Sequence, residues 1–458
     1  MTPPLIHDAG ADTAGLVNRT SRPTSPPSKP TTVLRWIIPA AAVALVLVSV
    51  VWGWRVQRDP NVKLGAAPLV GRWHIRFGWS LVPAALLAAY VSLRGTALVA
   101  RLRFGWMIAA SAAAAVGFTF LLAASDGLDH LLDPVVHRTE YWANLATLPA
   151  ASTMLHHYGT TEFLLQYSVH AKGHPPAFLL LLKALAALGL ARPWVAGALS
   201  YIGVGVGVAA VLLTVRRAGG EGLARRLAPF LVVAPYAVWM GTSADAFYAA
   251  IGAVGALLMV AAVTSSHAGR SRVQALGGGV VLGLLLFFTY GGVMFGLVVI
   301  VLTVGVGRHD LRRLMTVATI GVVGVCIVIG AFAAAGFWWF DGANVTRGFY
   351  WAGTAQFRPA NYFLVGNLGA ALIAIGPATI YGLSRLRDRR ALLIMASGAV
   401  ALLAADVSQY SKAEVERIWL LFYPWLMVGA IGVRRPRPWL AAQSALAIGL
   451  QLALVSKW

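Results

Sequence analysis

The sequence predicts an all-α, polytopic membrane protein with about thirteen transmembrane helices. Of its 458 residues, 59% are apolar and only 12% are charged, whereas soluble domains carry about a quarter charged residues. The mean hydropathy is +0.73. Long apolar runs alternate with short segments rich in arginine, which is the pattern of cytoplasmic loops. A soluble globular protein is therefore excluded, and we expect the net charge of +21 to reflect membrane topology rather than nucleic-acid binding.

The N-terminal part combines a polar tail with two apolar runs. Residues 1–32 are rich in Pro, Ser and Thr, which predicts a disordered cytoplasmic tail. The run 33–54 is long enough to span a bilayer and lacks a small-residue cleavage site, so we interpret it as an anchor. Together with the run 79–93 it forms two extra N-terminal helices within 33–103.

Eleven further apolar runs complete the predicted bundle. A core at 104–433 contains two large external segments, 125–193 and 336–359, and a last helix lies within 434–458. The predicted spans after residue 103 are 104–124, 194–215, 224–240, 243–264, 274–290, 291–307, 313–335, 360–384, 390–407, 417–433 and 438–455.

The apolar run 175–190 decides the orientation of everything that follows it. As a helix it would be only about 24 Å long, which is short for a hydrocarbon core of about 30 Å. If it lies on the outer surface and the N-terminus is cytoplasmic, five arginine-rich loops also become cytoplasmic, in line with the positive-inside rule. These loops hold sixteen arginines and are 216–226, 265–272, 308–313, 385–390 and 434–437. One loop disagrees, because 55–78 is basic and yet external in this topology.

Metal chemistry based on cysteine or histidine is not predicted. The single cysteine, Cys326, lies within an apolar run, so a disulfide or a Cys-based metal site within the chain is excluded. His170 and His174 have helical ligand spacing, but Pro175 and Pro176 follow at once and interrupt a helix through both.

Acidic side chains mark the start of the external segment 125–193. Asp126 and Asp129 follow a spanning helix, and Glu140 comes eleven residues after Asp129. A carboxylate at this position can act as a general base on a hydroxyl within hydrogen-bond reach. The alternative is that each of these acids is a solvated surface charge.

The order of motifs resembles a known family. The acidic segment is followed by His174-Pro175-Pro176 at the start of an apolar helix, and the next helix ends in Arg216-Arg217. This order, over about 104–433, resembles the GT-C superfamily of membrane glycosyltransferases. It is most similar to the branch of protein O-mannosyltransferases and aminoarabinose transferases (glycosyltransferase family 39-like). The resemblance implies that the first external loop carries the catalytic carboxylate and that the His-Pro-Pro helix lies along the membrane surface.

The family's acidic-aromatic signature, commonly D-E-x-Y-Y, is matched by Glu140, Tyr141 and Trp142. The Asp that precedes the Glu in the family is absent here. Glu140 therefore inherits the role of catalytic base, and Asp126 and Asp129 are competing candidates.

Three later stretches add candidates that the same resemblance implies. They are 235–260 with an external Asp245, 284–293 with Thr289 and Tyr290, and the charged 411–425. The residues expected to contact substrate are Tyr141, His170, Asp245, Tyr290, Glu414 and Glu416.

A lipid-linked sugar donor would require cations at the phosphate that leaves with the lipid. Arg417 is the first candidate for binding this phosphate, because a guanidinium can donate two hydrogen bonds to phosphate oxygens and stays charged. Lys412 and His174 are expected to assist. The alternatives are that Glu414 and Glu416 only orient Arg417, and that His174 caps a helix.

The resulting expectation is an inverting glycosyltransferase of the cell (inner) membrane. It would move a hexose such as mannose, a choice that rests on analogy, from a polyprenyl-phosphate-linked donor to an envelope glycan or protein acceptor on the outer face. The expected partners are these two substrates and membrane lipids, without nucleic acid. No cofactor is expected, although a divalent ion held by Asp126, Glu140 or a histidine is left open. The rival functions are a transporter or lipid flippase, favoured only by glycines at 277–279 and 291–292, and a non-catalytic scaffold.

Overall fold

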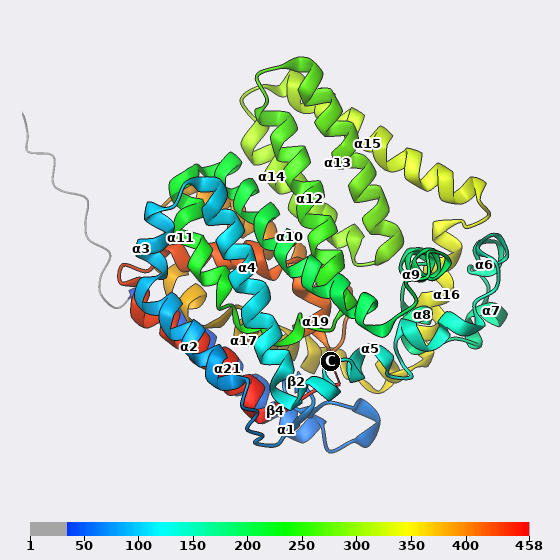
Figure 1. Cartoon of the computed structure of the whole chain (residues 1–458), viewed down its shortest axis with the longest axis horizontal. Coiled ribbons are helices and arrows are strands. Elements are labelled where there is room, and N and C mark those ends of the chain that lie inside the picture. Colours follow the sequence, from blue (N-terminus) through cyan, green and yellow to red (C-terminus); the bar gives the residue numbers. More distant parts are fainter. Residues whose placement is uncertain (1–33, 458) are drawn as a thin grey trace, which may run out of the picture.

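The computed structural model describes residues 34–457 as an almost entirely helical chain (Figure 1). Long helices form a bundle, and short helices gather beside one end of it, where α5 to α9 and α16 are labelled. The tail predicted for residues 1–32 lies outside the described residues. The strands in the described range form two antiparallel pairs, β1 (Gly65–Ala66) with β2 (Leu69–Val70) and β3 (Arg72–Trp73) with β4 (Leu454–Val455). This confirms an all-α, multi-spanning architecture.

Nine helical segments in the described range are long and apolar enough to cross a membrane. They are α1 (Leu34–Val56), α2 (Leu81–Tyr90) continued through a π-helical turn into α3 (Thr96–Arg101), α4 (Phe104–Ala123), α10 (Pro193–Gly219), α12 (Ala244–Thr264), α13 (Ala268–Phe288), α15 (Leu311–Ala334), α17 (Ala360–Leu383) and α18 (Arg389–Ser408).

Four other predicted spans take shorter or broken forms. Residues 224–240 become α11 (Glu221–Val232) followed by a 3-10 turn from Pro235, and 291–307 becomes the 16-residue α14 (Gly292–Gly307). Residues 417–433 form two short helical segments, Val415–Leu421 and Tyr423–Gly432, bent by 76° at Phe422. The run 438–455 lies in α21 (Pro436–Ala453), which is not among the nine. The count of thirteen spans therefore stays a prediction, with nine supported by length and composition, or ten if the bent pair counts as one.

Small residues bring the long helices into close contact. A methyl group on Gly279 of α13 would overlap the backbone carbonyl of Gly321 in α15, and a Cβ on Gly203 of α10 would lie 2.5 Å from the carbonyl oxygen of Ala246 in α12. In lipid, close van der Waals packing rather than the hydrophobic effect holds helices together, which favours glycine at such contacts. Gly279, one of the glycines that favoured a transporter, therefore has a packing role.

The arginine-rich loops lie at one end of the bundle. Arg225 donates hydrogen bonds to the carbonyl groups of Val99 and Leu102, the latter at 2.9 Å. The Arg216 guanidinium lies 4.1 Å from the centre of the Phe104 ring. The end of α10 and the start of α11 therefore contact the junction between α3 and α4.

Close approaches between other helix ends extend this face. A Cβ on Gly219 would lie 3.6 Å from Ile394 near the start of α18, and one on Gly307 would lie 3.4 Å from Val263 at the end of α12. A Cβ on Gly432 would lie 3.1 Å from the backbone of Leu386. A Cβ on Gly305 of α14 would overlap the side chain of Leu393 of α18, which joins these two groups of helix ends. The five loops thus share one end of the bundle, as the charge pattern requires.

The segment 125–193, which is predicted to be external, folds into short helices at the opposite end of the bundle (Figure 1). Its elements are α5 (Asp133–Val136), α6 (Ala151–His157), α7 (Thr161–Leu165), α8 (Val169–Gly173) and α9 (Ala177–Ala187). With eleven residues, α9 is about 16 Å long and too short to cross a bilayer. The second external segment forms α16 (Trp339–Ala352), where the Thr346 hydroxyl donates to the carbonyl oxygen of Lys172 at 2.9 Å.

The basic 55–78 loop also lies at this end. We call residues 57–76 the N-terminal cap. Arg76 forms a 2.5 Å ion pair with Asp126, and the cap residues Val62 and Val70 are buried in a cluster with Tyr362 of α17 and Ala413. The 55–78 loop, whose basic residues disagree with the predicted charge pattern, therefore folds over the end of the bundle at which the predicted external segments lie.

The predicted orientation can be tested with a cysteine at position 217, in a Cys326→Ser background. Arg217 is exposed at the arginine-rich end, whereas Ala143 is exposed in the external segment. In intact cells, an impermeant thiol reagent should label Ala143→Cys but leave Arg217→Cys unlabelled until the cells are lysed. Labelling of Arg217→Cys in intact cells would contradict a cytoplasmic location of these loops.

Candidate functional site

Four side chains from distant parts of the sequence form one hydrogen-bonded chain, which we call the polar network. Glu140 Oε2 lies 2.7 Å from His170 Nδ1, and His170 Nε2 lies 3.4 Å from an Arg417 terminal nitrogen. The other terminal nitrogen of Arg417 donates to Asp245 Oδ2 at 2.7 Å. An imidazole with its proton on Nδ1 satisfies both contacts, since it donates to the carboxylate and accepts from the guanidinium.

His170 and Glu140 are aligned by local backbone bonds. The backbone N–H of His170 donates to the carbonyl oxygen of Thr139 at 3.1 Å, next to Glu140 in the chain. Ser168 caps α8 by accepting from the N–H of Ala171, and the Asn144 amide bonds both the hydroxyl and the N–H of Ser168, at 2.7 and 2.8 Å. The exposed fractions are 10% for the His170 side chain and 18% for the Glu140 side chain, so the carboxylate keeps access to solvent.

Asp245 lies in the first turn of α12, where the helix dipole favours a negative charge. Ser243 caps this helix, accepts from the N–H of Asp245 at 3.2 Å and donates from its hydroxyl to Oδ2 at 3.0 Å. The Asp245 side chain is 4% exposed and that of Arg417 is 6% exposed. Two opposite charges are thus buried against each other, and removing either one would leave the other uncompensated.

Residues 411–417, which we call the charged loop, carry Arg417 into the network. Asn367 of α17 holds this loop, because its side chain accepts from the N–H of Ala413 at 3.1 Å and donates to the carbonyl oxygen of Ser411 at 2.8 Å. The same amide donates to Asp406 at 2.9 Å. Asn367 was not predicted from the sequence, although a polar side chain within an apolar span is costly to bury and therefore indicates a functional position.

Glu416 and Lys412 serve the packing of the charged loop. Glu416 is fully buried and accepts the N–H of Val70 in the N-terminal cap at 2.8 Å. The Lys412 ammonium donates to the carbonyl oxygen of Arg358 at 3.0 Å and lies 4.7 Å from the Trp351 ring centre. Burial and the nearby Arg358 lower the pKa of Lys412. The roles in phosphate or substrate binding expected for Lys412 and Glu416 stay predictions.

Aromatic rings surround the histidines. Tyr141 is buried, and its ring centre lies 4.8 Å from that of Phe178 and 5.7 Å from that of His174. Burial raises the pKa of Tyr141 well above its usual range. Tyr290 instead packs against Trp339 of α16, with ring centres 5.4 Å apart, and none of its ring contacts in the described range involves the polar network.

His174 is held as a neutral side chain. Its Nδ1 lies 3.2 Å from the carbonyl oxygen of His170, which requires the proton on Nδ1 and leaves Nε2 as an acceptor. Burial lowers its pKa to about 4; the Asp245 charge opposes this shift, while His170 and Arg417 add to it. A neutral acceptor suits contact with a hydroxyl group better than contact with a phosphate.

The competing acids lie apart from the polar network. Asp126 pairs with Arg76 and Asp129 is exposed. With His130 and Thr242, Asp126 and Arg76 line a separate polar cavity of about 70 Å³. Among residues 34–457, no group of three or more His, Cys, Asp or Glu side chains is arranged to hold a metal ion.

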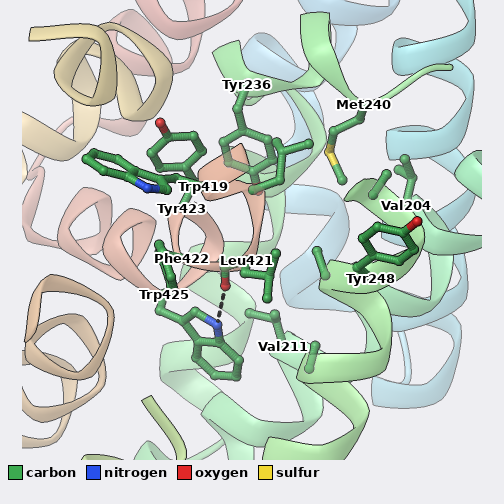
Figure 2. Packing of buried hydrophobic residues seen from close by; sticks show 14 of the residues in the cluster. Val204, Val211, Tyr236, Met240, Tyr248, Trp419, Leu421, Phe422, Tyr423 and Trp425 are labelled. Atoms are coloured by element: carbon green, nitrogen blue, oxygen red, sulfur yellow. Dashed lines mark hydrogen bonds between the residues drawn. The ribbon is translucent and has the colours of Figure 1, made fainter. Parts of the chain in front are cut away.

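Figure 2 shows an apolar cluster to which the segments that carry Asp245 and Arg417 also contribute Tyr248 and Leu421. Tyr248 follows Asp245 by one helical turn, and Leu421 follows Arg417 by four residues. Val204, Tyr236 and Leu421 contribute to the lining of a small cavity of about 20 Å³ between α4, α10 and α12. Buried apolar side chains therefore lie on the inner side of the network, whereas the side chains of Glu140 and the neighbouring Glu414 are 18% and 28% exposed.

Neither a protein-family model nor a curated protein matches this sequence. The GT-C resemblance accordingly rests on the motifs and stays a prediction. The structure does bring Glu140, His170, Asp245 and Arg417 together, with Glu414 3.4 Å from Arg417. An ionised carboxylate, an imidazole and a guanidinium in this order can accept a proton at one end and bind an anion at the other.

The neutral state of His174 predicts a loss of stability in acid. In the unfolded chain, His174 takes up a proton below about pH 6.5. In the folded chain, it takes up a proton only below about pH 4. The stability is highest above pH 6.5 and falls by on the order of 3 kcal/mol as the pH is lowered to 4. In detergent, His174→Asn should flatten the pH dependence of Tm between pH 7 and 4, whereas the exposed His157→Asn should not. Equal pH dependence in the wild type and His174→Asn would contradict this account.

Proposed function

We propose that the protein is an inner-membrane glycosyltransferase of the GT-C type. In this proposal it moves a sugar from a polyprenyl-phosphate-linked donor to a hydroxyl of an envelope glycan or protein on the outer face, with inversion. The observation that carries the proposal is that one imidazole, His170, joins the candidate base Glu140 to the candidate phosphate-binding Arg417. Glu140 and Arg417 were predicted from separate motifs and lie 277 positions apart in the sequence.

Glu140 is suited to act as the base. The hydrogen bond from His170 to Oε2 fixes the direction of the carboxylate, and Oε1 would take the proton of the acceptor hydroxyl. As that proton leaves, the acceptor oxygen forms a bond to the anomeric carbon, and the bond from that carbon to the phosphate oxygen breaks. One displacement inverts the configuration and releases the lipid phosphate.

Arg417 is suited to stabilise the leaving phosphate. Its guanidinium is buried and oriented by Asp245, so that it needs little reorganisation when negative charge develops on the phosphate. Because the Arg417 side chain is buried, its interaction with phosphate is stronger than it would be at an exposed arginine. Mannose or another hexose is the proposed sugar by family analogy alone.

The test uses a deletion strain that is complemented with the wild type, Glu140→Gln or Glu162→Gln. The last is the matched control, since Glu162 is an exposed acid of the same external segment. We expect the deletion to accumulate a polyprenyl-phosphate sugar and to lose one sugar from an envelope glycan or glycoprotein. Glu140→Gln should restore less than about 1% of the transfer, because general base catalysis contributes 10²–10⁴-fold. Glu162→Gln should restore it fully.

Other outcomes separate the alternatives. If Glu140→Gln reaches the membrane and restores transfer, Glu140 is not the base, and Asp126→Asn and Asp129→Asn become the variants to examine. Unchanged lipid and glycan pools in the deletion strain, with redundant enzymes removed, would contradict the transferase and favour a transporter or flippase.

A further inference from the structure

The carboxylate of Glu414 lies between two buried arginines. Its Oε1 is 3.6 Å from a terminal nitrogen of Arg358, and its Oε2 is 3.4 Å from a terminal nitrogen of Arg417. The side chains of Arg358 and Arg417 are only 8% and 6% exposed, whereas that of Glu414 is 28% exposed. One partly exposed carboxylate thus bridges two guanidinium groups that are otherwise covered by protein.

Other contacts hold both guanidinium groups in place. Arg358 Nε donates to the carbonyl oxygen of Val62 in the N-terminal cap at 3.0 Å, and a terminal nitrogen donates to the carbonyl oxygen of Lys412. Arg417 is fixed by its ion pair with Asp245. The nitrogens that face Glu414 are therefore positioned independently of Glu414, and they converge on one site.

The backbone at Glu414 is in a costly conformation. Ala413 and Glu414 have φ angles of 65° and 60°, in the left-handed region that residues other than glycine seldom adopt. Consecutive residues of this kind cost of order 1 kcal/mol each and occur at ligand clamps and switch regions. Within the charged loop, Glu414 alone is not buried.

Charge explains why a carboxylate occupies this position. Burial alone would raise the pKa of the Glu414 carboxyl, but the guanidinium groups of Arg358 and Arg417 outweigh it, and the pKa is lowered. Without an anion between them, two buried cations would repel each other at short range. The site therefore needs one anionic group, and Glu414 supplies it from within the chain.

We propose that Arg358 and Arg417 form an anion site for the phosphate of an isoprenyl-phosphate lipid, and that the Glu414 carboxylate occupies it until the lipid displaces it. Phosphate presents its oxygens to arginine in the same bidentate way as carboxylate. Glu414 leaves towards solvent, from which its side chain is only partly shielded. The inference rests on the proposed function for the identity of the lipid, and it adds Arg358, which no sequence motif indicated.

This arrangement also assigns a role to Lys412. Its carbonyl oxygen accepts from Arg358, and its ammonium donates to the carbonyl oxygen of Arg358. Lys412 is therefore a positioning residue for Arg358 and does not itself need to reach the phosphate.

The experiment measures binding of farnesyl phosphate to the full-length protein in detergent, with farnesol as the phosphate-free control. Glu414→Gln keeps the shape but removes the competing charge, so we expect binding about tenfold tighter than in the wild type. Arg358→Gln should weaken binding at least about tenfold, and Arg347→Gln, an exposed arginine of α16, should leave it unchanged. Because misfolding cannot produce a gain in affinity, the Glu414→Gln result is decisive. Unchanged or weaker binding in Glu414→Gln, or equal binding of farnesol, would overturn the proposal.

Competition identifies the source of the phosphate. Displacement of farnesyl phosphate by inorganic phosphate alone would show a site for free phosphate. Displacement by phosphatidylglycerol micelles would show a site for membrane headgroups. Either result would overturn the isoprenyl-phosphate assignment. A failure of the proposed function can be distinguished from a failure of the anion site. Tighter binding in Glu414→Gln together with unchanged glycans in the deletion strain would leave the anion site standing and refute the transferase.

Discussion

The buried ion pair between Arg417 and Asp245 is the interaction on which the candidate site depends. A guanidinium that is only 6% exposed requires compensation, and Asp245 at the start of α12 provides it at 2.7 Å. This pair fixes the direction in which Arg417 offers its second terminal nitrogen to His170 and Glu414. Through His170 the same constraint reaches Glu140, so that an acid of the external segment is positioned by a residue of the last third of the chain.

A second set of contacts keeps the charged loop in its unusual conformation. Asn367 bonds the loop from α17, and Val70 of the N-terminal cap bonds Glu416 from the other side. Arg358 joins the cap to the loop through the carbonyl oxygens of Val62 and Lys412. The cap is therefore part of the site's support, which explains why a basic loop lies at the end of the bundle opposite the arginine-rich loops.

Hydropathy and charge were sufficient to predict the helical bundle and the shared location of the arginine-rich loops, because both are local properties of the chain. Glu140, His170, Asp245 and Arg417 were each named from their own motif, but their contact depends on helix packing that no local pattern encodes. Arg358 was not among the predicted site residues for the same reason, since only the fold brings the N-terminal cap and the charged loop to it. The predicted span 417–433 is bent by 76° at Phe422, and its hydropathy does not reveal this bend.

The most direct test of this account is a double-mutant cycle between Asp245→Asn and Arg417→Gln, read from unfolding of the full-length protein in detergent. A buried ion pair at 2.7 Å predicts that each single variant loses about 3 kcal/mol or more, while the double variant recovers much of that loss. The predicted coupling energy is then about 2 kcal/mol or more. Additive losses, with a coupling energy near zero, would contradict the contact on which the polar network depends.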